Sequence, residues 1–196
     1  MIKKIFKFFI IFNCFVIPFS KLNASVIEIG NNNAKIVVKV FSSLTCPHCA
    51  SFHKNIYENL KADYIESKKV KFEHHSFPLD LASLSAEKIL RATNDKEIRF
   101  KLLKEFYEKQ KIWAVGSDIE EINKKIKKIG SKYGLSDIQM ENFFKNEDIQ
   151  NEILNSRITA VKKYDISSTP TIIINEKKYE GKHTYKDFKK TIEKLL

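Results

Sequence analysis

The sequence predicts an α/β fold in which a long helical segment interrupts a small β-sheet domain. Three observations predict it: apolar, β-branched strands near both ends of the chain, helical periodicity through the middle, and a Cys-x-x-Cys motif at the end of one strand. The motif, Cys46-Pro47-His48-Cys49, is the most informative stretch of the chain. The third cysteine, Cys14, lies in an N-terminal segment that we expect to be removed.

The N-terminal segment has the three-part layout of a secretory signal peptide. A basic start that includes Lys3 and Lys4 precedes an apolar stretch at 8–19, and Ala24 ends a plausible cleavage site. The apolar stretch is shorter than the roughly 20 residues that a membrane-spanning helix needs. We therefore expect residues 1–24 to be a signal peptide and the mature protein to be periplasmic, or membrane-anchored if the signal is not cleaved.

Composition narrows the class of protein. Residues 25–196 are enough for one domain with a proper core, or for a domain that carries a large insertion. The formal net charge of +11 comes almost entirely from lysines spread along the chain, which predicts solvated helix faces and no nucleic-acid site. A single close cysteine pair in an exported protein favours redox chemistry over a structural disulfide framework.

Five segments have the pattern of strands. Residues 36–41 form the strongest of them, because they are mostly apolar and β-branched, and this strand runs directly into the cysteine motif. The other predicted strands are 26–29, 70–76, 171–175 and 177–180.

The rest of the pattern is helical. One face of a helix after the motif is marked by four residues at every fourth position: Phe52, Ile56, Leu60 and Tyr64. Helical periodicity continues from about residue 81 to 164, and 184–196 closes the chain as a helix. We expect Trp113, the only tryptophan, to lie in the core of the helical segment.

This order of elements predicts a thioredoxin fold with an inserted helical subdomain. The elements are strand, Cys-x-x-Cys, helix and strand, then about eighty helical residues, then proline, strand, strand and helix. On this prediction, 25–80 and 165–196 form the thioredoxin-like domain and 81–164 form the helical insertion.

The chain resembles the DsbA family of thiol:disulfide interchange proteins. The resemblance rests on the stretch 43–50 (SLTCPHCA), on 77–80 (FPLD), on 169–171 (TPT) and on the closing helix, and it covers essentially the whole mature chain. In a plain thioredoxin the proline would stand much nearer the motif, whereas Pro170 lies 121 residues after Cys49.

The two cysteines are expected to have different roles. Cys46 lies where a strand passes into a helix, and Pro47 suits the first helical turn, so the Cys46 sulfur can face free backbone N–H groups. The helix dipole contributes only about 0.3–1 kcal/mol, less than one pKa unit. Backbone hydrogen bonds and a positive or hydrogen-bonding His48 must therefore supply the rest. We predict that Cys46 is the exposed nucleophile and Cys49 the buried partner that resolves the mixed disulfide.

His48 also indicates the direction of the reaction. Whatever stabilises the thiolate stabilises the reduced form, so the disulfide becomes a better oxidant. A histidine between the cysteines favours this, and a solvent-exposed filler is the alternative interpretation of His48.

The resemblance implies a second site element. In the family the peptide bond that corresponds to Thr169–Pro170 is cis and faces the cysteine pair. The backbone of Thr169 would then be exposed and could pair with a substrate strand. From the residues alone, a trans proline that opens a strand would be the default.

Two positions depart from the family pattern. An acidic residue often lies six positions before the first cysteine, buried under the second, where it can relay a proton. Here that position is Val40, while Lys39 points to the opposite face of the strand. Proton transfer from Cys49 then relies on water or another group. Ser168 replaces a usual glycine, with an effect only on substrate approach.

The sequence therefore predicts an exported oxidase that donates its disulfide to unfolded polypeptides. The resemblance implies recharging by a membrane quinone-linked, DsbB-like thiol oxidase, and we expect a monomer with no cofactor. An exported reductase or isomerase is the nearer alternative. A carrier of Cu(I) or Zn held by Cys46 and Cys49, with or without His53, is the other. His74 and His75 point to opposite faces of a strand, so surface or satisfied core positions are expected for the remaining histidines.

Overall fold

The computed structural model of the chain describes residues 26–196. The predicted signal peptide, residues 1–24, lies outside the described residues, and so does Cys14 within it. Within the part that is described, none of the helices combines the length and the apolar character that crossing a bilayer requires.

A mixed β-sheet forms the centre of the described chain. Its strands are β1 (Val26–Ile29), β2 (Ile36–Ser42), β3 (Val70–Ser76), β4 (Thr171–Ile174) and β5 (Lys177–Lys178). They lie in the order β1-β3-β2-β4-β5. The neighbours β2 and β3 are parallel, and every other pair in this order is antiparallel. The predicted strands and the α/β class are thus confirmed, with β5 shorter than its sequence pattern indicated.

The parallel pair needs a crossover, and one continuous helical stretch after the motif supplies it. It consists of α1 (Pro47–Phe52), η1 (His53–Tyr57), α2 (Glu58–Leu60) and η2 (Lys61–Ile65), of which η1 and η2 are π-helical turns. In a regular α-helix, residues four apart drift by about 40° per step. The wider π turns offset this drift, so the four residues predicted to share a face are all buried.

Most other helices lie between β3 and β4 in the chain. They are α3 (Leu81–Leu90), α4 (Lys96–Glu108), α5 (Gln110–Trp113), α6 (Ile119–Lys132), α7 (Asp137–Lys145) and α8 (Glu147–Tyr164), and α9 (Tyr185–Leu195) follows the sheet. Several begin with a capping side chain. Ser136 and Thr184, for example, each accept a hydrogen bond from a backbone N–H two or three residues into their helix.

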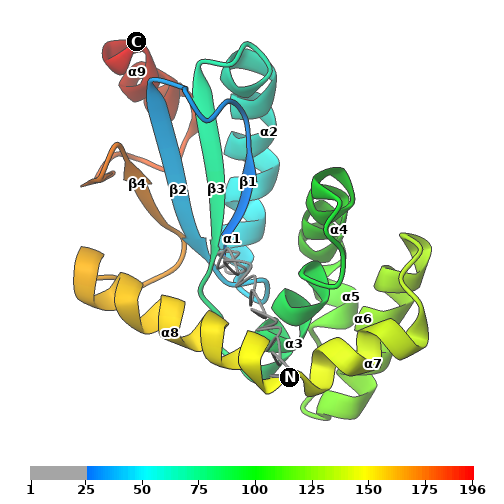
Figure 1. The fold of residues 1–196 in the computed structure, drawn as a ribbon. Helices are drawn as coiled ribbons and strands as arrows, with labels where there is room; N and C mark the ends of the chain where they lie inside the picture. The colour runs from blue at the N-terminus through cyan, green and yellow to red at the C-terminus, as the bar shows by residue number, and fades with distance from the viewer. Residues whose placement is uncertain (1–25) are drawn as a thin grey trace, which may run out of the picture.

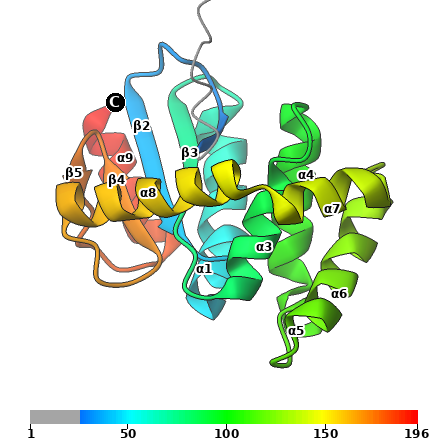
Figure 2. The ribbon, with the colours of Figure 1, turned by 60° about the horizontal axis from the view of Figure 1, so that its bottom comes forward.

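The helices cover the sheet unequally. The crossover helix and α9 lie on one face, α8 passes over the other, and α3 to α7 gather beside β1 (Figures 1 and 2). The side chains of Val38 and Val40 point to the first face and pack with Phe52 and Phe188, whereas Phe41 points to the second and packs with Ala160. Alternation along β2 therefore serves two separate cores.

A third core lies among the helices α3 to α6. Trp113 is completely buried there and donates a hydrogen bond from its indole nitrogen to the Phe106 carbonyl oxygen at 2.7 Å, as expected for the single tryptophan. Cys46 and Cys49 belong to the same cluster, although they follow a sheet strand in sequence. The cysteine motif is therefore where the sheet domain meets the helical segment.

Candidate active site

The cysteine motif begins where β2 ends. Cys46 is the N-cap residue of α1 in an extended conformation, and Pro47 occupies the first turn, where a missing N–H costs nothing. The Cys46 N–H donates to the Ser43 carbonyl oxygen at 3.1 Å, and the Cys46 carbonyl accepts from the Cys49 N–H at 3.1 Å. The backbone N–H groups of His48 and Cys49, at the start of this helix, act on the Cys46 sulfur.

The two cysteines differ in their exposure. Both are free thiols; Cys46 is 7% exposed and Cys49 is 1% exposed. Cys46 is the more exposed of the two, as predicted. The expectation that Cys46 is exposed is nevertheless wrong, because its side chain is largely covered. Sequence periodicity carries no information about this cover, which comes from distant residues such as Thr169. The two residues between the cysteines, Pro47 and His48, are exposed.

Thr169 and Pro170 lie against the Cys46 sulfur. The Thr169–Pro170 bond is cis, as the family resemblance implied and against the default from the residues alone. The Cys46 thiol donates a hydrogen bond to the Thr169 carbonyl oxygen, with a sulfur–oxygen distance of 3.4 Å. The Thr169 hydroxyl is buried and has no hydrogen-bond partner in this thiol form, so it is free to donate to a thiolate.

The environment of Cys46 favours its thiolate. A hydrogen bond from the Cys49 thiol is the largest cause, and together with donation from the Thr169 hydroxyl and from the backbone N–H groups of Cys49 and His48 it lowers the pKa of Cys46 to about 5. Burial opposes these donors but does not outweigh them. The Cys46 sulfur is consequently ionised at neutral pH.

Cys49 has the opposite character. Burial is the largest cause that raises its pKa far above that of a free thiol, and the adjacent Cys46 sulfur raises it further. Cys49 therefore remains protonated at neutral pH while Cys46 is a thiolate, so the same pair contains one nucleophile and one hydrogen-bond donor.

His48 contributes through its backbone. Its N–H is one of the donors to the Cys46 sulfur, while its imidazole is exposed to solvent. The expected backbone hydrogen bonds to the Cys46 sulfur are thus present, and the Cys49 thiol and the Thr169 hydroxyl add to them. A role for the His48 side chain stays a prediction.

Side chains from and just before the helical segment hold the loop that precedes the motif. Gln110 donates from Nε2 to the carbonyl oxygens of Leu44 at 2.7 Å and of Cys46 at 3.1 Å. Ser83 accepts from the Leu44 N–H at 3.0 Å, and Thr45 donates to Asp80 at 2.7 Å.

Asp80 and Gln110 support the loop before the motif, and the sequence analysis did not identify either of them. Asp80 also caps α3 by accepting from the Ser83 N–H at 2.7 Å, so an Asp-x-x-Ser cap just after the FPL stretch was the available signal. Gln110 had no such signal, because its acceptors lie more than sixty residues earlier in the chain.

Val40, at the position where the family often has an acid, is buried. The ionisable side chain of Tyr107 lies nearby instead: burial is the main cause that raises its pKa well above the ordinary value, followed by its neighbours Cys49 and Glu87. Glu87 is fully buried on α3, and its carboxylate pairs with His74 Nε2 at 3.0 Å and Arg91 Nη1 at 3.1 Å.

The histidines outside the motif do not join the cysteines. His74 is a satisfied core residue through Glu87, and His75 pairs with Glu73 at 2.9 Å on the other face of β3, as expected. His53 differs from expectation, because it is buried with an unpartnered Nε2 and its ring stacks on Tyr57. Across residues 26–196, no three His, Cys, Asp or Glu side chains are grouped so that they could hold a metal ion.

Comparison with known proteins agrees with this geometry. A family model described as "Thioredoxin" matches residues 23–194. The chain belongs to this family. Its fold is also that of "alpha-DsbA1" from Wolbachia pipientis, whose crystal structure superposes with a TM-score of 0.80 at 24% identity, over 92% of this chain and 93% of that one. The predicted DsbA-like thioredoxin fold is thereby confirmed.

Two proteins similar to this chain have names that refer to disulfide chemistry. The "Disulfide bond formation protein D" of Bacillus subtilis is 26% identical over 86% of this chain and 76% of its own length. A "Putative protein-disulfide oxidoreductase" of Rickettsia bellii is 26% identical over 79% of this chain. The match spans only 59% of the Rickettsia protein's length.

Proposed function

We propose that this thioredoxin-family chain is a protein-disulfide oxidoreductase that transfers the Cys46–Cys49 disulfide to thiols of folding polypeptides. The observation that carries the proposal is the asymmetry of the pair: one sulfur is stabilised as a thiolate by four donors, and the other is buried and protonated. The names of the Bacillus and Rickettsia relatives support the same reaction type.

The reaction follows from this asymmetry. A substrate thiolate attacks the Cys46 sulfur of the oxidised protein, the bond between the cysteines breaks, and the Cys49 sulfur leaves and takes up a proton. A second substrate thiolate then attacks the substrate sulfur of the mixed disulfide and releases Cys46. Because the pKa of Cys46 is about 5, it is a good leaving group, and the reduced protein is favoured. The substrate gains the disulfide and the protein holds two electrons more.

Thr169 and Pro170 are proposed to bind the substrate beside Cys46, with Pro47 and His48 as the exposed neighbours of the reacting sulfur. In the thiol form the Thr169 carbonyl oxygen is occupied by the Cys46 S–H. When Cys46 is engaged in a disulfide, this carbonyl is free to accept a backbone N–H from an extended substrate segment.

We further propose that the protein is exported by residues 1–24, acts as a monomer in the periplasm, and returns its two electrons to a DsbB-like, quinone-linked thiol oxidase in the membrane. The division into a thioredoxin-like domain (25–80 and 165–196) and a helical insertion (81–164) is part of the same proposal. Its support is that the helical segment packs around a core of its own, which includes the buried Trp113.

The reduction potential tests the direction of transfer. The protein is equilibrated against mixtures of reduced and oxidised glutathione, and the fraction of Cys46–Cys49 disulfide is measured by alkylation and mass spectrometry. We expect a potential well above the roughly −270 mV of thioredoxin, toward −120 mV. A value at or below that of thioredoxin would identify an exported reductase and overturn the oxidase proposal.

A pair of matched variants tests the roles of the cysteines. Cys49→Ala should accumulate a mixed disulfide between Cys46 and a reduced two-cysteine peptide, because the resolving thiol is gone. Cys46→Ala should trap none, because the remaining sulfur is only 1% exposed. Equal trapping by both variants would contradict the assignment of Cys46 as the nucleophile.

A further inference from the structure

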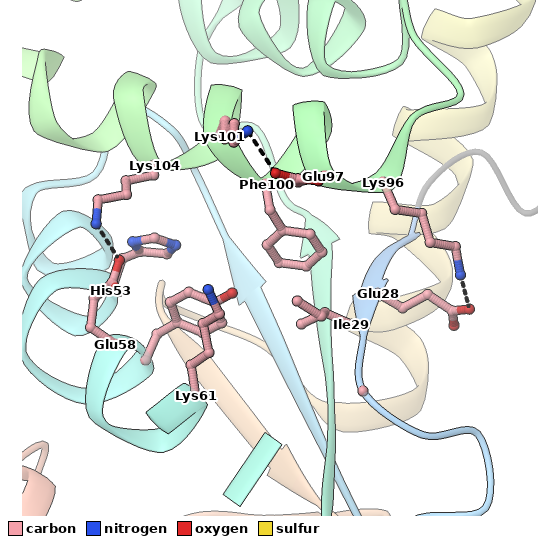
Figure 3. Close-up of a pocket in the computed structure, with 12 residues that line it drawn as sticks. Glu28, Ile29, His53, Glu58, Lys61, Lys96, Glu97, Phe100, Lys101 and Lys104 are labelled. Atoms are coloured by element: carbon pink, nitrogen blue, oxygen red, sulfur yellow. Dashed lines mark hydrogen bonds and ion pairs between the residues drawn. The ribbon is translucent and has the colours of Figure 1, made fainter. Parts of the chain in front are cut away.

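A cavity of about 500 Å³ lies between β1, the crossover helix and α4, away from the cysteines (Figure 3). Neither the cysteine motif nor the Thr169–Pro170 segment lines it. Its walls come from the sheet domain on one side and from the helical segment on the other. Small-molecule sites often occupy such junctions, and their usual volume range includes this one.

The interior wall of the cavity is aromatic. The rings of Tyr57 and Phe100 are nearly parallel, with centroids 6.1 Å apart and an interplanar angle of 10°. His53 stacks on Tyr57 with ring centroids 4.4 Å apart. Figure 3 shows the His53 and Phe100 rings and the Ile29 side chain turned toward the same space. Tyr57 is nearly fully buried, whereas the Phe100 ring is partly exposed and offers a flat aromatic body a surface to stack on.

One buried polar atom in the wall has no partner. His53 is 5% exposed, and its Nε2 makes no hydrogen bond within the described residues. Burial is the main cause that lowers the pKa of His53 to about 3, so the imidazole is neutral at pH 7 and Nε2 carries one unused hydrogen-bonding capacity. Buried polar atoms in folded proteins are rarely left unpaired, and a polar ligand atom would satisfy this one.

The charges at the rim leave one lysine unpaired. Three of the four lining lysines form ion pairs across or along the rim, and Figure 3 draws these pairs. They are Lys104 with Glu58 at 3.0 Å, Lys96 with Glu28 at 3.3 Å and Lys101 with Glu97 at 2.6 Å. Within residues 26–196, the fourth lysine, Lys61, has no ion pair. The rim therefore carries a single uncompensated positive charge, which complements a single negative one.

We propose that this cavity is a binding site for a small aromatic molecule with one carboxylate. The aromatic body stacks on the Phe100 ring, the carboxylate pairs with Lys61, and a polar atom of the ligand bonds to His53 Nε2. Because the cavity joins the crossover helix to α4, an occupant adds contacts between the cysteine-bearing helix and the helical segment and raises the melting temperature.

The test uses the purified full chain and 2-naphthoate as the probe. Binding is measured by calorimetric titration, by the melting temperature, and by the NMR resonance of the His53 ring. We expect saturable one-to-one binding of 2-naphthoate, a higher melting temperature and a shifted His53 signal. The neutral analogue 2-naphthylmethanol should bind about tenfold more weakly, and the cationic 2-naphthylmethylamine weaker still.

Two variants test the site itself. Lys61→Gln should weaken 2-naphthoate binding about tenfold and leave 2-naphthylmethanol unchanged, whereas Lys128→Gln, at an exposed lysine of α6, should alter neither. His53→Phe keeps the ring and removes Nε2, and it should weaken both ligands. Failure of 2-naphthoate to saturate, equal binding by Lys61→Gln and Lys128→Gln, or binding that leaves the His53 resonance unmoved would each overturn the proposal.

Discussion

Two buried polar regions of the molecule lie close together and are built in opposite ways. Around Cys46, the Cys49 thiol and the Thr169 hydroxyl are buried hydrogen-bond donors. The Thr169 hydroxyl has no partner until the Cys46 thiolate forms. Around Glu87, both carboxylate oxygens already accept hydrogen bonds, from His74 on one side and from Ser76 and Arg91 on the other. The first region is arranged for a change of charge and the second for a constant one.

The comparison separates chemistry from support. A buried group that must gain and lose charge needs donors that are satisfied in only one of its states. A buried carboxylate that keeps its charge is tolerated when its oxygens are satisfied, as both oxygens of Glu87 are. Four predictions can break or sharpen this contrast, in order of decreasing effect.

The largest effect concerns the titration of Cys46. In the reduced protein, the ultraviolet absorbance of the thiolate should rise with a midpoint near pH 5, and Cys49 should remain silent through neutral pH. Because the folded-state pKa of Cys46 lies below the unfolded value, its contribution to stability is complete above about pH 9. It declines as the pH falls and is lost below about pH 5. Chemical unfolding of the reduced and the oxidised protein at several pH values measures this change in stability. A thiolate absorbance midpoint near pH 9 would contradict the prediction.

The second prediction concerns Glu87. Glu87→Gln leaves Arg91 and His74 without their carboxylate and should lower the unfolding free energy by about 3–5 kcal/mol, while the midpoint of Cys46 stays near pH 5. Glu120→Gln, at an exposed position of α6, is the control and should change little.

Acid should reduce the effect of this substitution. Glu87 has a folded pKa below its ordinary value, so its contribution is present above about pH 4.5 and is lost as the pH falls through the folded pKa. The difference between wild type and Glu87→Gln should therefore shrink in acid. A large shift of the Cys46 midpoint in this variant would show that the two regions are not separate.

The third prediction concerns Gln110, which links the helical segment to the loop before the motif. Gln110→Ala leaves the carbonyl oxygens of Leu44 and Cys46 short of a donor and should cost about 1–3 kcal/mol of stability. It should also slow disulfide transfer, because the loop loses its support. The neighbouring exposed Lys111→Ala should do neither, and equal losses in both variants would argue for a general effect on α5.

The smallest effect concerns the Thr169 hydroxyl. Thr169→Val keeps the shape of the side chain and removes one donor to the thiolate, worth about 1 kcal/mol, so the pKa of Cys46 should rise by less than one unit. At neutral pH the reduced variant should lose a similar amount of stability, because the folded pKa of Cys46 moves toward its unfolded value. Below about pH 5, where Cys46 is a thiol and the hydroxyl has no partner, stability should hold or increase slightly. Thr159→Val, on the exposed side of α8, serves as the control, and an unchanged midpoint in Thr169→Val would remove Thr169 from the set of donors.

Much of the fold was predictable because it depends on local pattern. Alternating and continuous apolar runs identified the strands, and a period near four identified the crossover helix. The relation of Cys46 to Cys49 also followed from the short motif and the strand-to-helix boundary. The cover over Cys46 was not predictable, because Thr169 and the helical core approach it from far along the chain.

The remaining histidines illustrate the same limit. His53 and His74 are both buried, yet one has a carboxylate partner and the other has none. Nothing in the residues beside them distinguishes the two cases. The partner of His74 is Glu87 on α3, and the cavity beside His53 is lined by residues of α4. Each environment therefore depends on how the helices pack.

The amino-acid sequence by itself determined the order of elements, the thioredoxin-like arrangement and the position of the cysteine pair at a helix N-terminus. These depend on periodicity, turn chemistry and the spacing of two thiols, all of which act over a few residues. Only the tertiary structure decided which groups lower the pKa of Cys46, which residues support its loop, and where the cavity beside His53 lies. Burial and hydrogen bonding between distant segments set those features, because a pKa or a cavity depends on every atom within a few ångströms and not on neighbours in the chain.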